Sequence, residues 1–108
     1  MKKGKSPIDL TLKIQEKAVL VGLITQNQSA ELVGEYLDEL AFLTETAGAV
    51  PVKQFVQKMA GPNPKTFLGK GKMEELLLFV KEEKIDMVIF DDELTPSQLR
   101  NIEKLLEV

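Results

Sequence analysis

The sequence predicts a three-layer α/β/α domain built on a mostly parallel sheet. Two uninterrupted apolar runs are typical of strands buried on both faces, as central parallel strands are. Each of three β candidates is followed by apolar residues at helical spacing. Short connections in the order β-α-β-α-β-α favour right-handed crossovers, which place helices on both faces of one sheet. At 108 residues the chain forms one domain at most.

The first unit is a central strand followed by a long helix. The strand is predicted at residues 17–25, because residues 19–24 are apolar without a break. A polar turn follows, and Ser29 is the expected N-cap of a helix at residues 30–47. Gly48 suits the position after that helix, where the backbone favours a left-handed conformation.

The second unit begins with an edge strand. Residues 50–59 contain Pro51 and two lysines among their apolar residues, a composition typical of a strand at the edge of a sheet. A stiff proline-containing loop comes next. It leads to Gly69-Lys70-Gly71-Lys72, which opens a helix at residues 71–83.

The third unit carries the clearest local signals. The strand at residues 87–91 is apolar up to Phe90 and is predicted to be central. Thr95-Pro96-Ser97-Gln98 then matches a capping box with proline at the first helical position, so a helix is expected at residues 96–106. Its predicted apolar stripe consists of Leu99, Ile102, Leu105 and Leu106.

These units predict the strand order 2-1-3, with a fourth strand beside the third. The end of the chain at Val108 is interpreted as a cut made where that strand would begin. Residues 1–16 are expected to form a flexible tail or an extra edge strand, because apolar and polar residues alternate from 8 to 14.

Composition excludes several function classes. The chain has no cysteine and no histidine, so disulfides, thiolate sites and imidazole chemistry are excluded. No apolar run is long enough to span a membrane, and no secretory signal is present, which favours the cytoplasm.

The net charge is −3, yet residues 46–73 hold no acid and five lysines. This stretch predicts a basic face; the alternative is a solvated loop and edge strand.

The carboxyl ends of the strands are the expected ligand-binding edge, where residues 25–29, 58–72 and 91–95 should meet. Gly69, Lys70, Gly71 and Lys72 at a helix start form the best anion site, since glycines allow close approach and lysines add positive charge. The segment is neither a Walker A loop nor a dinucleotide fingerprint. The alternative is a helix start whose shape requires glycine.

Two further groups of residues carry weaker signals. Asp91 and Asp92 are weak Mg²⁺ candidates after a strand; the alternative is charge on a turn. Arg100 and Asn101 lie away from the apolar stripe of the last helix and are candidates for contact with phosphate or RNA. The alternative there is a solvated helix face.

Three segments resemble the N-terminal domain of the HflX family of ribosome-associated GTPases. Residues 90–103, FDDELTPSQLRNIE, are similar to the family run FDDELSPxQxRNLE. Residues 66–72, TFLGKGK, resemble T-(Y/F)-(I/L/V)-G-x-G-K, and residues 43–49, LTETAGA, resemble LAETAGA. The departures are Thr95 for Ser and Thr44 for Ala. The resemblance covers residues 17–108.

The resemblance implies an HflX-type domain at residues 17–108, truncated before a helical hairpin and a GTPase domain. GTP and Mg²⁺ would then bind outside this chain, which would be no enzyme and need no cofactor of its own. The implied partners are the large ribosomal subunit with its RNA, in ribosome splitting or rescue, and the protein's own GTPase domain. The resemblance adds weight to five contact residues: Lys65, Lys70, Lys72, Arg100 and Asn101.

Two alternatives stay open at this point. The domain could gate the GTPase domain as an intramolecular regulatory module, with its basic face incidental. It could also bind ATP, as proposed within the family, although no recognised motif supports this. The sequence leaves the oligomeric state undetermined.

Overall fold

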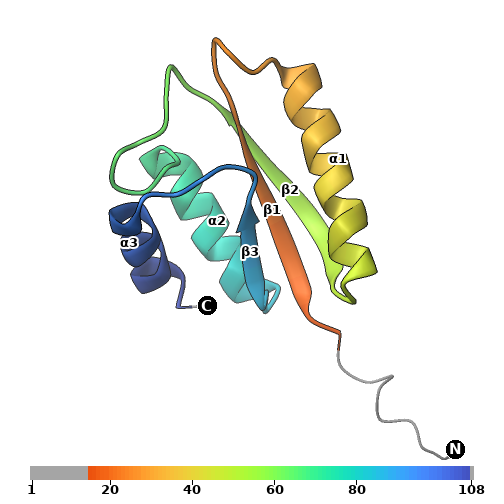
Figure 1. Cartoon of the computed structure of the whole chain (residues 1–108). Coiled ribbons are helices and arrows are strands. Elements are labelled where there is room, and N and C mark those ends of the chain that lie inside the picture. The colour runs from red at the N-terminus through yellow and green to blue at the C-terminus, as the bar shows by residue number, and fades with distance from the viewer. Residues whose placement is uncertain (1–14, 108) are drawn as a thin grey trace, which may run out of the picture.

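A computed structural model describes residues 15–107 and shows three strand–helix units (Figure 1). The elements are β1 (Lys17–Ile24), α1 (Ala30–Thr46), β2 (Val50–Lys58), α2 (Lys70–Glu82), β3 (Met87–Phe90) and α3 (Pro96–Leu106). The predicted bounds of every element agree with these within one residue. The alternating segment 8–14 and Val108 lie outside the described residues.

The sheet is parallel, and its order β2-β1-β3 confirms the prediction. β2 is an edge strand, as its proline and lysines indicate, and the register shifts opposite Pro51, between Ala18 and Val19. Within the described residues β3 forms the other edge, and all four of its residues are half-buried. Its apolar run predicts an interior strand with a further strand beside it, and that strand is not among residues 15–107.

The helices form the two outer layers, with α1 on one face and α2 and α3 on the other (Figure 1). On the α1 face, Leu20 packs with Val33 and Leu37. On the opposite face, Val19 and Val21 join a larger core cluster to which β2, α2 and α3 contribute. Because side chains alternate along a strand, the apolar run of β1 supplies both cores. No helix among residues 15–107 is long and apolar enough to cross a membrane.

The buried side of α3 differs from the predicted stripe. Gln98, Ile102 and Leu106 are buried, whereas Leu99 and Leu105 are 46% and 45% exposed. α3 packs against α2, and Gln98, Ile102 and Leu106, which are four residues apart, face the core. Leu99 and Leu105 therefore open onto two grooves on either side of the helix.

Candidate functional site

The three predicted segments do meet at one end of the sheet (Figure 1). The loop after β2 starts beside β1, where the Met59 amide donates to the Ile24 carbonyl. The turn after β3 begins where the Asp91 amide donates to the Val21 carbonyl. Since all three strands are parallel, the start of α2 and the acidic turn after β3 share this edge.

A short loop, Asn63–Phe67, projects from this edge and is closed by its own hydrogen bonds. Asn63 and Phe67 exchange backbone hydrogen bonds of 2.9 and 2.8 Å. The Asn63 Oδ1 accepts from the Lys65 and Thr66 amides at 2.8 and 3.3 Å. Phe67 has φ 70°, a left-handed conformation that is costly for a bulky residue, and its ring is buried edge-on against Phe90. Core packing therefore holds this loop, which we call the 63–67 loop, in one conformation.

α3 holds the 63–67 loop from outside. The Gln98 Nε2 donates to the Asn63 carbonyl at 2.7 Å, and Gln98 is only 4% exposed. The Asn101 Nδ2 donates to the Lys65 carbonyl at 3.1 Å. One of the predicted RNA contacts, Asn101, thus positions the backbone of another, Lys65, whose side chain is exposed.

The glycines at the start of α2 have different surroundings. Gly69 is the N-cap, and its amide donates to the Gln57 Oε1 at 2.9 Å. A Cβ at position 69 would lie 2.9 Å from the Gln57 Nε2, so a larger residue there would displace the end of the Gln57 side chain. Gly71 has open space around it. The close neighbour of Gly69 is thus a side chain of β2, and both the anion site and the alternative of a helix start shaped by glycine stay predictions.

The predicted cationic residues are placed around this edge but do not form one cluster. Lys72 pairs with Glu75 at 3.4 Å. Lys65 and Lys70 are exposed and form no ion pair within residues 15–107. The Arg100 Nη2 lies 3.5 Å from the Ser97 Oγ on an exposed face of α3. Lys65 and Lys70 are therefore free to contact a ligand, whereas Lys72 already has a partner.

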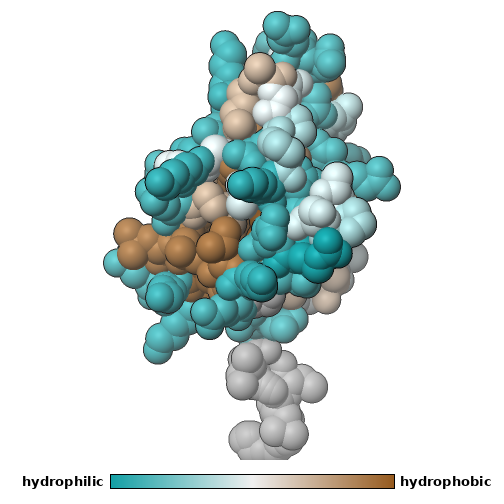
Figure 2. All heavy atoms as spheres, turned by 90° about the vertical axis from the view of Figure 1, so that its left-hand side faces the viewer, coloured by the Kyte–Doolittle hydropathy of each residue, from teal (hydrophilic) through white to brown (hydrophobic). Residues whose placement is uncertain are grey.

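These two lysines border a groove between α2 and α3, which we call the α2–α3 groove. Its volume is about 350 Å³. The lining residues are Asn63, Lys65, Thr66, Lys70, Met73, Glu74, Leu77 and Leu105. A second hollow continues from it along α3, bordered by Asn101 and Lys104. Figure 2, viewed from the α3 side, shows a hydrophobic area there with hydrophilic residues around it.

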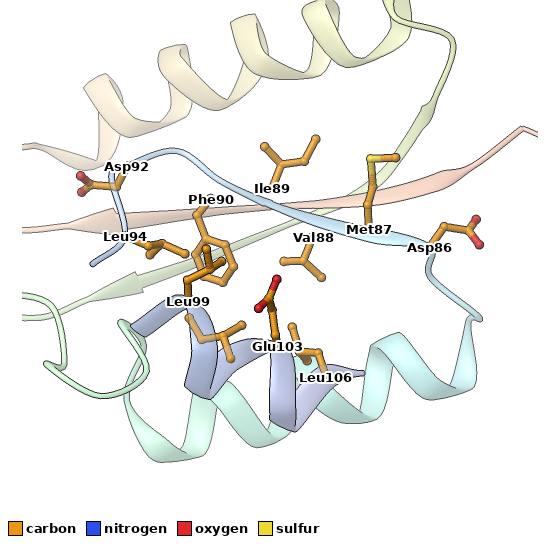
Figure 3. Close-up of a pocket in the computed structure, with 11 residues that line it drawn as sticks. Asp86, Met87, Val88, Ile89, Phe90, Asp92, Leu94, Leu99, Glu103 and Leu106 are labelled. Carbon is orange, nitrogen blue, oxygen red and sulfur yellow. The ribbon is translucent and has the colours of Figure 1, made fainter. Parts of the chain in front are cut away.

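A second groove of about 340 Å³ follows the free edge of β3 and is called the β3-edge groove (Figure 3). Val88 and Phe90 point toward α3, whereas Met87 and Ile89 point to the other face of the strand. Leu94, Leu99 and Leu106 complete an apolar wall. Asp86 and Asp92 lie at the two ends of the groove. Glu103 on α3 lies between these ends, so the groove has an apolar wall and carries three acids and no lysine.

In the acidic turn, the Asp91 carboxylate is partly buried and lies near other negative charges. Burial raises the pKa of the Asp91 carboxyl above its ordinary value of 3.8, and repulsion from Asp92 and Glu39 raises it further. The Asp92 Oδ1 accepts from the Glu93 amide at 2.8 Å, which positions the turn. Among residues 15–107 no cluster of three or more acidic or other metal-ligating side chains is placed to hold an ion.

Asp91→Asn is expected to raise the melting temperature at pH 7 by about 1–3 °C. A carboxyl whose pKa is raised by folding binds its proton more tightly in the folded state, so stability falls as pH rises from 3.8 through the folded-state pKa. The gain from asparagine should therefore disappear below pH 3.8. Thermal melts of both proteins across this pH range would test the assignment. An equal gain at every pH would contradict it.

Three positions important to this edge are missed or only partly explained by sequence patterns. The pattern around Gln98 identifies a capping box but not the link to the 63–67 loop. Asn63 before Pro64 is a turn signal that could reveal the loop's side-chain hydrogen bonds. Apolar spacing assigns Leu105 to the core, and nothing in that spacing shows that it lines a groove instead.

The comparisons with known proteins agree with this architecture. Residues 34–108 match the family model described as GTP-binding GTPase N-terminal. A GTPase HflX from Flavobacterium psychrophilum is 61% identical over 92 residues, which is 85% of this chain and 22% of that protein. Those from Caldanaerobacter subterraneus and Escherichia coli are 42% and 37% identical over 87% and 85% of the chain, and 21% of each relative. The chain thus spans about a fifth of the length of these relatives.

Proposed function

The chain belongs to the HflX family of GTPases, as their N-terminal domain, and on this premise we propose that it binds the large ribosomal subunit through ribosomal RNA. In the longer protein this binding would serve ribosome splitting or rescue in the cytoplasm. The matched segment is not the part that hydrolyses GTP, so the domain contributes binding.

The observation that supports this proposal best is the pair of lysines beside the α2–α3 groove, neither of which forms an ion pair within residues 15–107. Lys65 and Lys70 belong to the acid-free stretch 46–73 of a chain whose net charge is −3. The 63–67 loop fixes the backbone of Lys65 before any ligand arrives, which lowers the ordering cost of binding. Lysines held on one edge are suited to the phosphate backbone of RNA, and such binding weakens with salt. Lys104 on α3 borders the adjoining hollow, and Arg100 is exposed on the same helix.

The double variant Lys65→Glu plus Lys70→Glu is expected to weaken large-subunit binding about tenfold or more at low salt, because two phosphate contacts become repulsive. Binding would be measured by co-sedimentation of the 108-residue chain with purified large subunits at several salt concentrations. The matched control is Lys81→Glu plus Lys84→Glu, which changes net charge equally at the far end of α2. Equal losses in both double variants would show a general charge effect and would contradict a local RNA contact.

A second candidate function is docking onto another part of the longer protein, which would gate its GTPase activity. The β3-edge groove favours it, because β3 has an unpaired edge and an apolar wall in the described residues. Adding the 108-residue chain to the separate GTPase domain, without ribosomes, would distinguish the two functions. A change in GTP hydrolysis would support gating, and no change would leave RNA binding as the function.

A further inference from the structure

We propose that the α2–α3 groove holds one unstacked base of single-stranded RNA, with the adjoining phosphates on Lys65 and Lys70. This inference rests on the proposed RNA-binding function and names what part of the RNA enters the domain. Three features that occur together in this groove support the inference. They are an apolar floor, exposed lysines at the border and a hydrogen-bond donor held in one orientation.

The floor of the α2–α3 groove is apolar and comes from two helices. Met73 and Leu77 on α2 face Leu105 on α3. Leu105 is 45% exposed, so a ligand in the groove would remove apolar surface from water. The groove volume of about 350 Å³ is at the lower end of the range of small-molecule sites. A base has flat apolar faces and a polar edge, and it fits both the lining and the size of the groove.

The charges around the groove select an anionic occupant. Lys65 and Lys70 stand at its border, and Lys104 borders the adjoining hollow. Glu74 is the one acid among the lining residues. A nucleotide combines a ring that has apolar faces with a phosphate, and this combination matches an apolar floor beside lysines. The base must come from a single strand, loop or bulge, because paired bases are not free to leave the helix.

A hydrogen-bond donor is also fixed at the edge of the groove. The Asn63 Oδ1 accepts from two backbone amides, which determines the orientation of the carboxamide. The Asn63 Nδ2 consequently faces away from those amides and forms no hydrogen bond within residues 15–107. It is available to donate to an oxygen or ring nitrogen of a base, which would give the groove polar recognition as well as apolar contact.

The test compares two RNA probes and two leucine variants of the 108-residue chain. One probe is a short unstructured RNA oligonucleotide with a fluorophore, and the other has the same backbone with every base removed. The variants are Leu105→Gln, in the groove, and Leu99→Gln, on the other side of α3 with nearly the same exposure. Fluorescence anisotropy gives the affinities, and circular dichroism confirms that each variant is folded.

We expect the abasic probe to bind about fivefold or more weakly than the intact probe, because it loses the apolar surface that a base would bury against the aliphatic floor of the groove. Leu105→Gln should remove most of that difference, and Leu99→Gln should keep it. Equal affinities of the intact and abasic probes for the unchanged chain would overturn the inference, even if Leu105→Gln failed to fold.

The remaining outcomes separate this inference from the proposed function. If the chain sediments with large subunits but does not distinguish the two probes, RNA binding stands and base insertion fails. If Leu105→Gln weakens large-subunit binding without affecting either probe, the groove receives an apolar side chain of a ribosomal protein, which also overturns base insertion. If neither RNA nor large subunits bind, the proposed function itself fails.

Discussion

Gly22→Val is expected to lower the free energy of unfolding by about 3 kcal/mol, the upper part of the range for overpacked cores. Gly22 lies in the central strand β1 directly under α1. A Cβ at this position would lie 2.8 Å from the Val33 Cγ1 and 3.1 Å from the Leu37 Cδ1. Both neighbours are fully buried, so α1 must move away from the sheet to make room. Urea denaturation followed by circular dichroism would measure the loss.

Gly34→Ala is the matched control for that variant. Gly34 lies inside α1, and a Cβ added there would have nothing within 4 Å, so the extra methyl group meets no obstacle. Alanine in a helix interior is expected to raise the free energy of unfolding by about 0.5–1 kcal/mol. Opposite signs for the two variants would confirm that close packing of β1 against α1 requires Gly22. A stable Gly22→Val protein would show that α1 is not closely packed on β1.

Gln98→Ala is expected to lower the free energy of unfolding by about 2–3 kcal/mol. The Gln98 Oε1 accepts from the Thr95 amide and its Nε2 donates to the Asn63 carbonyl, so the variant loses the capping box and one of the two hydrogen bonds that this carbonyl accepts. It also removes one of the two hydrogen bonds by which α3 holds the 63–67 loop that carries Lys65, the other being that of Asn101. RNA and large-subunit binding should therefore weaken although every lysine is retained. Urea denaturation and the sedimentation assay would measure the two effects.

Two further variants separate the roles of Gln98. Thr95→Ala removes the Thr95 Oγ1 that accepts from the Gln98 amide, but it leaves the link to Asn63 in place. Its expected cost is about 1 kcal/mol, with no loss of RNA binding. Gln98→Glu keeps an acceptor for the Thr95 amide and places an oxygen against the Asn63 carbonyl, so it should resemble Gln98→Ala in binding. If Thr95→Ala weakened RNA binding as much as Gln98→Ala, the link between α3 and the 63–67 loop would have no functional role.

Local signals are sufficient for the elements of this fold because each signal acts within a few residues. The Thr95–Gln98 capping box and the first-turn proline predict the bounds of α3 correctly. Proline and lysines in residues 50–59 identify β2 as an edge strand. The uninterrupted apolar run of β1 requires burial on both faces, and this implies the parallel three-layer arrangement. The shared edge of the three loops follows from the same arrangement.

The sequence by itself thus determined the fold class, the strand order, the helix bounds and the family of this protein, because these depend on spacing, local hydrogen bonding and characteristic motifs. Only the tertiary structure decided what α3 buries and which polar side chains have partners. Leu105 is partly exposed and Gln98 is buried, because the packing of α3 beside α2 turns Gln98, Ile102 and Leu106 toward the core and leaves Leu105 at the border of a groove. Gly69 adjoins Gln57, and Asn101 holds the Lys65 carbonyl, through contacts between residues 12 and 36 positions apart. Contacts at such separations arise from the packing of whole elements, and no local pattern in the sequence encodes them.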